Sequence, residues 1–452
     1  MNVYGYGTLP ESATGADAWG KWALARLNAY SFGLAGFVLA MDTAVLPILV
    51  LEVAPEAAKN TLLGMIGLTG MLAAALVQVP VGWASDRTRS RLGRRLPYML
   101  WACVCIPVAL IALATPLTYS NLLVVWLFIQ INSGIAYSPY LASIRELVPA
   151  NRMGVAASIK TLLEALGGAS ILCLAALMVG HYSHPDASWW LWATLGMFAV
   201  AILATAGISS ATIYRRMREG GGAATAAFHR AAMAFPESTS MARLHPDLPW
   251  FVASRVAFLA AVVIFTTYGL FFLRDKVQVD NPAQALGVAI IGIGGMLVLT
   301  TYPSGWLSDR VGRKPVLAVG TVVALVATIA MMWVSTYLLA VLVASVIGGA
   351  VGVILTSHWA LANDLGTPGR EAQHMGVVNL GTLIGAAGAK AIGPLPDLVA
   401  VWFGPGFGYT ALLGASALLF SIGGLLLLRV RVERPAALAT AAPAGGDLER
   451  GR

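Results

Sequence analysis

Residues 82–95 read GWASDRTRSRLGRR, and residues 305–314 read GWLSDRVGRK. Both stretches lie between long apolar runs, and a proline precedes each by two residues, at Pro80 and Pro303. Two copies of one basic turn, one in each part of the chain, indicate that the protein consists of two similar halves. In a membrane protein, internal repeats of this kind are typical of transporters.

The composition is that of a chain that crosses a membrane many times. The 452 residues are 58% hydrophobic and 11% charged, whereas soluble domains carry about 25% charged residues. Apolar runs of about 20 residues, the length that spans a bilayer core, recur throughout. The net charge of +8 does not indicate nucleic-acid binding, because the basic residues fall in alternate short loops. The three cysteines lie inside apolar runs and predict no disulfide framework.

We expect twelve transmembrane helices, six in each half. The predicted spans are 29–51, 62–82, 97–117, 121–144, 155–179, 189–213, 250–272, 285–306, 316–334, 338–360, 375–392 and 409–428. The expected domains are a cytoplasmic tail at 1–28, a first bundle at 29–213, a cytoplasmic linker at 214–249, a second bundle at 250–428 and a disordered cytoplasmic tail at 429–452.

The positions of lysine and arginine predict the orientation. If the N-terminus is cytoplasmic, the loops on that side hold 23 of the 29 lysines and arginines, and the opposite loops hold three. Cytoplasmic loops of membrane proteins are enriched in these residues. We therefore expect both termini in the cytoplasm and the protein in the plasma, or inner, membrane.

The two basic stretches resemble the signature of the major facilitator superfamily, G-x-x-x-D-R-x-G-R-[RK]. The second copy matches it without a gap, and the first matches it after four inserted residues, 88–91. The matching positions are Gly82, Asp86, Arg87, Gly93, Arg94 and Arg95 in the first copy, and Gly305, Asp309, Arg310, Gly312, Arg313 and Lys314 in the second. The longer first copy is similar to that of the glycoside–pentoside–hexuronide and sucrose carriers. The resemblance implies an all-α membrane fold with two pseudo-symmetric six-helix bundles, and secondary active transport by alternating access.

The matched positions are expected to form a conformational latch. A glycine such as Gly82 allows close helix packing, and Asp86 ends the second span, where a carboxylate pairs with nearby arginines or with a helix N-terminus. In the superfamily this latch links the two halves while the cavity is open to the outside. The alternative is a basic loop that only sets the topology, which does not explain the spacing of glycine and aspartate.

Two differences from related transporter groups bear on the expected coupling ion and on the expected direction of transport. Sodium-coupled melibiose carriers of the similar group use acidic residues in spans 2 and 4, where this chain has none. Drug antiporters of the superfamily carry a Gly-Pro-Gly-Gly type motif in span 5, where this chain has only Gly167 and Gly168. These differences argue against sodium coupling and against export.

Ionisable residues inside the spans are the candidates for proton coupling, because a charge at the bilayer centre costs at least about 2.5–3.5 kcal/mol. Asp42 lies near the middle of span 1, Glu164 lies in span 5 one turn after Lys160, and Lys390 lies in span 11. Burial favours a neutral carboxyl group, whereas a neighbouring lysine favours an ionised one. A carboxyl group that alternates between these surroundings takes up and releases a proton. We rank Asp42 first and Glu164 second.

Each of these residues has a structural alternative. Lys160 and Glu164 can form a permanent ion pair, and Lys390 can extend toward the outer interface. Arg255, five residues into span 7, is more typical of a side chain that reaches the interface than of a ligand.

A polar stripe on span 4 is the candidate lining of a substrate cavity. Its members, three or four residues apart and so on one helix face, are Trp126, Gln130, Ser133, Tyr137 and Tyr140. Aromatic faces stack on sugar rings, and glutamine both donates and accepts hydrogen bonds. Tyr268 in span 7 and Trp359 in span 10 are expected to complete the pocket. The alternative for each aromatic residue is packing between helices.

The sequence therefore predicts a proton-coupled carrier that imports a small polar solute, such as a sugar or glycoside. Its expected partners are the solute, a proton and the lipid bilayer, with function as a monomer and without a cofactor, a metal or nucleic acid. A proton-driven exporter of amphipathic drugs or metabolites is the alternative. An enzyme is disfavoured because the spans contain neither a His-Glu-x-x-His stretch nor a paired Asp-rich motif. A sensor that has the carrier fold but transports no solute is a further alternative.

Overall fold

The computed structural model describes residues 19–115, 118–149, 152–182, 186–219, 245–366 and 371–431, without the side chains of residues 219, 371–373 and 405. Most of the predicted linker at 214–249 and most of the two predicted tails lie outside the described residues.

The described residues contain twelve helical segments that are long and apolar enough to cross a membrane. The first half contains α1 (Lys21–Leu27), α2 (Ala29–Ala40), the π-helical segment η3 (Met41–Val45), α3 (Leu46–Val53), the 3₁₀ turn η4 (Glu56–Ala58), α4 (Lys59–Arg87), α5 (Leu96–Leu113), α6 (Tyr119–Leu147), α7 (Met153–Val179) and α8 (Trp189–Glu219). The second half contains α10 (Leu248–Asp275), α11 (Pro282–Val311), α12 (Arg313–Met331), α13 (Tyr337–Asp364), α14 (Glu371–Ala391), α15 (Pro394–Phe403) and α16 (Pro405–Leu428). The predicted twelve spans are confirmed.

Several helices are longer than the sequence predicted. The second span covers Glu56–Arg87 and the eighth covers Pro282–Val311. At 1.5 Å per residue, helices of this length exceed the roughly 30 Å hydrocarbon core of a bilayer. A span predicted from hydropathy stops where the apolar residues stop, whereas the helix continues into the polar residues beyond them.

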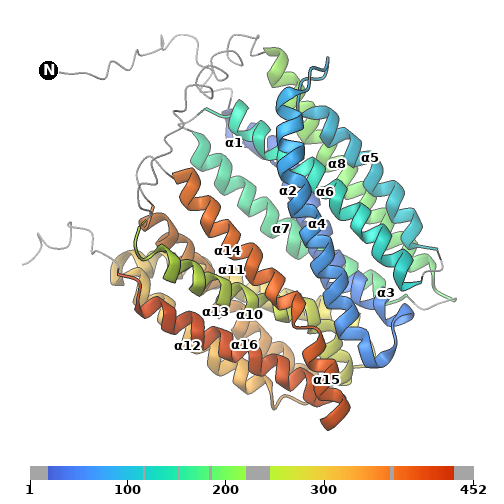
Figure 1. Cartoon of the computed structure of the whole chain (residues 1–452), viewed down its shortest axis with the longest axis vertical. Coiled ribbons are helices and arrows are strands. Elements are labelled where there is room, and N and C mark those ends of the chain that lie inside the picture. Colours follow the sequence, from blue (N-terminus) through green and yellow to red (C-terminus); the bar gives the residue numbers. More distant parts are fainter. Residues whose placement is uncertain are drawn as a thin grey trace, which may run out of the picture.

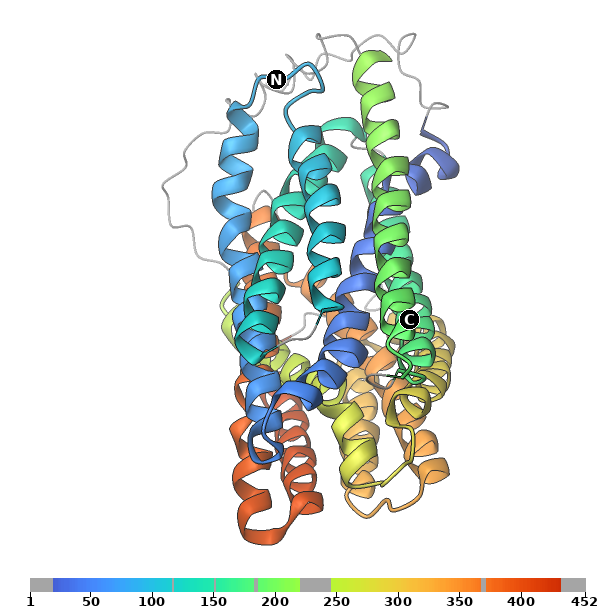
Figure 2. The same ribbon diagram turned by 90° about the vertical axis from the view of Figure 1, so that its right-hand side faces the viewer.

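The helices form two bundles, which confirms the predicted fold class. Figure 1 shows the first half, blue to green, beside the second half, yellow to red, and Figure 2 shows the same two groups after a quarter turn. We call the end of the helices that carries the two basic stretches the motif side, and the opposite end the far side. The start of α2 lies on the motif side, and the start of α4 lies on the far side, because consecutive spans run in opposite directions.

Each bundle repeats the same close crossing between its first and fifth spans. A Cβ atom at Gly167 on α7 would lie 2.1 Å from the carbonyl oxygen of Phe32 on α2. In the second half, a Cβ atom at Gly385 on α14 would lie 2.6 Å from the carbonyl oxygen of Val256 on α10. Small residues at such crossings allow two backbones to touch, which gives membrane helices their packing energy.

The second and fourth spans of each bundle also cross at glycines. A Cβ atom at Gly134 on α6 would lie 2.6 Å from the carbonyl oxygen of Ala74 on α4. A Cβ atom at Gly352 on α13 would lie 2.7 Å from the carbonyl oxygen of Leu297 on α11. The two halves therefore repeat in three dimensions the relation that the basic stretches show in sequence.

We predict that Gly167→Ala destabilises the first bundle, because the added methyl group would overlap the backbone of Phe32. Overpacking of this kind costs about 1–3 kcal/mol, and the midpoint of thermal unfolding in detergent should fall by several degrees. Gly207→Ala on α8 is the matched control, because a Cβ atom there meets nothing within 4 Å. Equal midpoints for the two variants would contradict the proposed crossing.

Candidate functional site

A cavity with several polar and charged side chains in its wall lies between the two bundles, with an empty volume of about 1240 Å³ that includes its open mouth. The first half supplies most of its lining from α2, η3, α4, α6 and α7, and the second half supplies residues of α10 and α14. Its walls run from Asp42 and Lys390, in the middle of the helices, to Ser31 and Gln78, nearer the motif side. The cavity therefore extends from the middle of the protein toward the motif side.

Asp42 lies in the π-helical segment η3, which interrupts the first span between α2 and α3. A π-helical turn inserts one extra residue into a helix and occurs frequently at functional sites. The Oδ2 atom of Asp42 lies 3.0 Å from Nζ of Lys390 on α14. Its other oxygen, Oδ1, is buried and has no hydrogen-bond partner among the residues that the structure describes. This ion pair joins the first bundle to the second at the inner end of the cavity.

The neighbouring helix α4 is shaped to admit Lys390. A Cβ atom at Gly67 would lie 2.8 Å from Nζ of Lys390, and one at Gly64 would lie 2.3 Å from its carbonyl oxygen. The hydroxyl group of Tyr268 donates a hydrogen bond of 3.1 Å to the same carbonyl oxygen. Lys390 is thus buried between the halves, with its chain against α4 and its ammonium group on Asp42.

Glu164 also lines the cavity, and its partner belongs to the same helix. Nζ of Lys160 lies 2.6 Å from Oε1 of Glu164, one turn away on α7. The same ammonium group lies 5.8 Å from the centre of the Tyr137 ring. Because all three residues belong to the first bundle, this pair does not depend on how the two halves are placed.

The structure divides the polar stripe of the fourth span. Gln130, Ser133 and Tyr137 line the cavity. Trp126 is fully buried, and its Nε1 atom lies against Gly70 on α4, where no described residue accepts a hydrogen bond from it. Tyr140 is also fully buried, and its hydroxyl group pairs with that of Ser31 at 2.7 Å.

The two aromatic residues predicted to complete the pocket lie outside the lining of this cavity. Tyr268 holds the backbone of Lys390 and lines a different cavity. Trp359 on α13 is 45% exposed and stacks with Arg255, whose guanidinium carbon lies 5.5 Å from the ring centre.

On the far side, a carboxylate of the second half caps a helix of the first half. The first turn of a helix leaves backbone N–H groups without partners, and Ala58, which precedes α4, has no side chain to accept from them. Asp397 on α15 accepts from the backbone N–H and the hydroxyl of Thr61, both at 2.7 Å, and from Nδ2 of Asn60 at 2.7 Å. The cap holds only while the far ends of the two halves touch.

A buried ion pair lies beside this cap. Nζ of Lys59 at the start of α4 is 2.6 Å from Oδ2 of Asp275 at the end of α10, and both side chains are buried. Tyr409 on α16 donates its hydroxyl hydrogen to Asp275. A further contact joins α7 to α11, where Asn281 donates to the carbonyl oxygen of Gly180 at 2.6 Å. Together these contacts close the far side.

The two basic stretches form equivalent clusters on the motif side, each inside its own half. In the first, Arg95 pairs with Asp86 at 2.5 Å and with Glu146 at 2.5 Å. In the second, Arg313 pairs with Asp309 and, at 3.2 Å, with Asp364. Within the described residues, no ion pair or hydrogen bond joins the halves at this end. The ion pairs that join the latch positions to other described residues therefore each lie within one half in this conformation.

The glycines that precede these arginines have positive φ angles, +88° at Gly93 and +108° at Gly312. Residues with a Cβ atom rarely adopt this conformation, which explains the glycine in both copies. The arginine that pairs with two carboxylates is the second residue after Gly93, Arg95, but the first after Gly312, Arg313.

The other motif residues repeat between the halves. Arg87 stacks on Trp83 with 3.7 Å to the ring centre, and Arg310 stacks on Trp306 with 3.9 Å. Gly82 faces Ser138 on α6, and Gly305 faces Thr356 on α13. Arg94 pairs with Glu146 at 3.1 Å. Lys314 makes no ion pair or hydrogen bond with another described residue.

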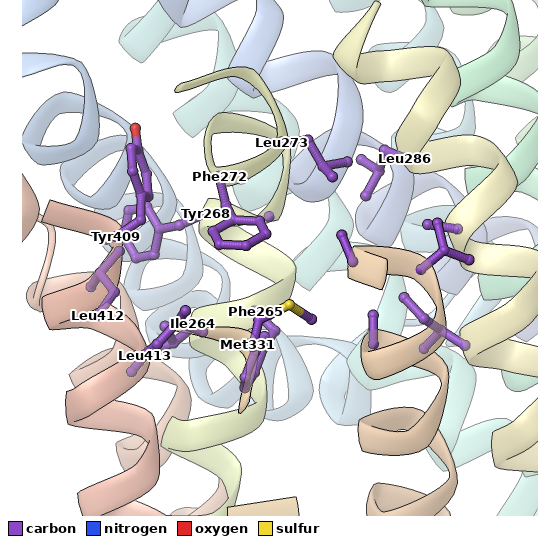
Figure 3. Close-up of a pocket in the computed structure, with 16 residues that line it drawn as sticks. Ile264, Phe265, Tyr268, Phe272, Leu273, Leu286, Met331, Tyr409, Leu412 and Leu413 are labelled. Atoms are coloured by element: carbon purple, nitrogen blue, oxygen red, sulfur yellow. The ribbon is translucent and has the colours of Figure 1, made fainter. Parts of the chain in front are cut away.

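A second cavity lies inside the second bundle. It encloses an empty volume of about 670 Å³, and its lining is almost entirely apolar. Figure 3 shows Tyr268, Phe272, Tyr409 and Leu413 among the side chains around it. Because the hydroxyl groups of Tyr268 and Tyr409 bond to Lys390 and Asp275, this cavity offers few groups to recognise a polar solute.

The sequence did not indicate the far-side contacts. Lys59, Asp275 and Asp397 were visible only as charges near the ends of spans. Their pairing depends on which helix ends meet across the two halves, and no local pattern reports that. The available signal was that one lysine and two carboxylates, which have opposite charges, lie near span ends.

Two six-helix bundles that enclose a polar cavity, closed at one end and extended toward the other, define a membrane transporter. A family model described as Major Facilitator Superfamily matches residues 32–389 and 251–448. The chain therefore belongs to this superfamily and is a multi-pass membrane protein.

Solved structures of the same fold are distant in sequence. The crystal structure of a D-xylose-proton symporter has a TM-score of 0.66 and 14% identity, covering 90% of this chain and 97% of that one. A bacterial homologue of the human lysosomal transporter Spinster, inward-facing and occupied, has a TM-score of 0.61 and 14% identity, covering 92% and 97%. The peptide transporter POT with alafosfalin has a TM-score of 0.63 and 16% identity, covering 90% and 93%. The comparison with curated protein sequences gave no match.

We predict that Asp397→Ala opens the far side, because it removes the acceptor for Asn60 and Thr61 at the start of α4. The measurement is the labelling of a Thr43→Cys variant, without the native cysteines, by a membrane-impermeant maleimide added from the far side. Thr43 lines the cavity and is buried beneath the far-side contacts. Labelling should become several-fold faster.

Asp280→Ala is the matched control for this experiment. Asp280 is an exposed carboxylate on the same side without an ion pair in the described structure. If Asp397→Ala labels no faster than Asp280→Ala, the cap at α4 does not hold the far side closed.

Proposed function

We propose that this transporter is a proton-coupled importer of a small polar solute, with a sugar or glycoside as the solute class. The observation that supports this most is the ion pair between Asp42 and Lys390. It lies at the inner end of the cavity and joins the two halves. Separation of the halves, which admits the solute, and protonation of the Asp42 carboxylate would therefore both break the same ion pair. The D-xylose-proton symporter of the same fold supports coupling to a proton.

The proposed cycle follows from the position of this pair. When the far side opens, α14 and η3 separate, and Asp42 loses its ammonium partner in a surrounding of low polarity. A lone buried carboxyl group favours its protonated form. When the far side closes again over the bound solute, Lys390 returns to Asp42 and favours the ionised carboxylate, so the proton leaves through the cavity toward the motif side.

Glu164 has a different role in this proposal. Its pair with Lys160 lies within one helix, so we propose that it persists in both conformations. It therefore lacks the change of surroundings that proton coupling requires, and we assign it to solute binding with Gln130 and Tyr137, which line the same cavity. Asp42 is the proposed proton site.

The motif side is proposed to face the cytoplasm. The excess of lysine and arginine in the loops of that side favours it, and it places both termini and the linker in the cytoplasm. The described conformation is then open to the cytoplasm. We further propose the inner membrane as the location, a single chain as the functional unit, and the glycoside–pentoside–hexuronide and sucrose carriers as the subgroup, from the longer first motif copy.

The motif clusters are proposed to act as the latch of the opposite conformation. In the described state, Asp86 and Asp309 pair with arginines of their own halves. Closing the motif side would bring the ends of the two bundles together and allow these charges to exchange partners between the halves.

Transport direction tests the proposal. In vesicles oriented with the far side outward, an inward proton gradient should drive uphill uptake of a solute that first stabilises the purified protein in a thermal-shift screen of sugars and glycosides. Uptake should collapse when a protonophore removes the gradient. Extrusion of the solute against its gradient under the same conditions would instead identify a proton-driven exporter.

We predict that Asp42→Asn abolishes proton-driven accumulation but retains exchange of labelled solute across the membrane. The amide cannot take up or release the transported proton, whereas it still fills the position beside Lys390. Asp186→Asn, a change at an exposed carboxylate in the far-side loop, is the control. Accumulation by Asp42→Asn at the wild-type level would exclude this residue as the coupling site.

A further inference from the structure

Arg255 is a buried cation without an acidic partner. It lies in the second turn of α10 with 7% of its surface exposed. The other two basic residues inside the predicted spans have carboxylate partners, since Lys160 pairs with Glu164 and Lys390 pairs with Asp42. Within the described residues, no carboxylate lies within ion-pair distance of Arg255. A charge buried in this way is costly unless another group compensates it.

The surroundings of Arg255 hold the guanidinium group but leave most of its donors free. Nε donates to the hydroxyl oxygen of Thr382 on α14 at 2.8 Å. The guanidinium carbon lies 5.5 Å from the centre of the Trp359 ring on α13. A guanidinium group has five N–H donors, and the described structure provides an acceptor for one of them. The remaining donors form a fork of the kind that binds a carboxylate or phosphate in bidentate fashion.

The helix register places Arg255 on the route to the cavity. Arg255 and Thr266 are eleven residues apart on α10 and therefore share a helix face, and Thr266 lines the cavity. On α14, Thr382, Ala386 and Lys390 follow one another at intervals of four, and the last two line the cavity. Arg255 and Thr382 thus continue the wall of the cavity toward its open, motif side.

The charges around the cavity do not balance. The cavity lining contains Asp42, Glu164 and Lys390. Lys390 pairs with Asp42, and Lys160 pairs with Glu164, so these four charges balance. Arg255, which lies beyond the lining, adds one positive charge in excess. In a region of low dielectric constant an excess charge attracts a counter-charge strongly.

We propose that Arg255, with Thr382 and Trp359, binds a carboxylate or phosphate group of the transported solute. The inference rests on the proposed transport function and specifies its substrate class as a small organic anion, such as a sugar acid or a sugar phosphate. The anion supplies the charge that the cavity lacks, the hydroxyl of Thr382 fixes the guanidinium plane, and Trp359 offers an exposed ring beside it.

The phosphate of a lipid headgroup is the competing source of an anion. An arginine near the end of a span commonly extends to the membrane interface. Arg255 instead turns to two neighbouring helices of its own bundle, since Thr382 and Trp359 hold it. The geometry therefore favours the solute, and the experiment separates the two sources.

The test uses pairs of probes that differ only in charge. Purified full-length protein in a neutral detergent is heated with D-glucuronate or D-glucose, and with glucose 6-phosphate or glucose, at constant ionic strength. We expect the acidic member of at least one pair to raise the unfolding midpoint in a saturable way. Arg255→Gln should weaken that apparent affinity roughly 10- to 100-fold, and Arg255→Lys should lose less.

Arg429→Gln is the matched control, because Arg429 also stacks on a tryptophan, Trp250, but is exposed. It should bind the acidic probe like the wild type. Equal effects of the acidic and neutral probes, or no effect of any of them at millimolar concentration, would overturn the proposal. Stabilisation by added phosphatidylglycerol but by no soluble anion would assign Arg255 to a lipid and also overturn it.

These outcomes do not depend on proton coupling. Binding is measured without a gradient, on the wild type and the variants of Arg255. If the wild type binds the acidic probe but shows no proton-driven accumulation, only the coupling proposal is refuted. Proton-driven uptake of a neutral solute would refute only the assignment of Arg255.

Discussion

The ion pair between Lys390 and Asp42 is the contact on which the rest of the site depends. Taking two charges out of water is expensive, and only close pairing with good geometry repays it. Here the two partners belong to different bundles, so the pair exists only while the bundles hold one relative position. The glycines at 64 and 67 make room for the lysine chain, Tyr268 holds its carbonyl oxygen, and the π-helical turn displaces Asp42 from the regular helix. Several features of the sequence that look unrelated thus serve a single buried contact.

The polar contacts at the two ends of the protein differ in whether they join the two halves. On the far side, charged and polar groups join the halves, with Asp397 capping α4 and Lys59 paired to Asp275. On the motif side, the arginines pair within their own halves, at Arg95 and Arg313. Buried polar groups must find partners, and here they find them across the halves at the closed end and within each half at the other. A rocking motion that exchanged these partners would open one end as it closed the other.

The duplicated halves share their packing but not their chemistry. Both use glycine crossings between equivalent spans and both carry the same basic turn. The acidic groups of the cavity, Asp42 and Glu164, come from the first half, whereas its lysine, Lys390, and the neighbouring Arg255 come from the second. The acidic groups of the first half and the basic groups of the second therefore attract each other near the cavity. A solute that changes this balance, by bringing a charge or a proton, also changes how strongly the halves attract each other.

The sequence by itself determined the number of spans, the pairing of the halves and the two basic turns, because hydropathy and charge repeat locally along the chain. It also singled out the ionisable residues within the spans, because such residues are rare in apolar helices. Only the tertiary structure decided their partners. Lys390 meets Asp42 and not the outer interface, Trp126 and Tyr140 pack between helices while Gln130 and Tyr137 face the cavity, and Asp397 caps a helix of the other half. These outcomes depend on how helices far apart in sequence cross and rotate. A pattern with the period of one helix places residues on a common face, but it does not say which neighbour that face meets.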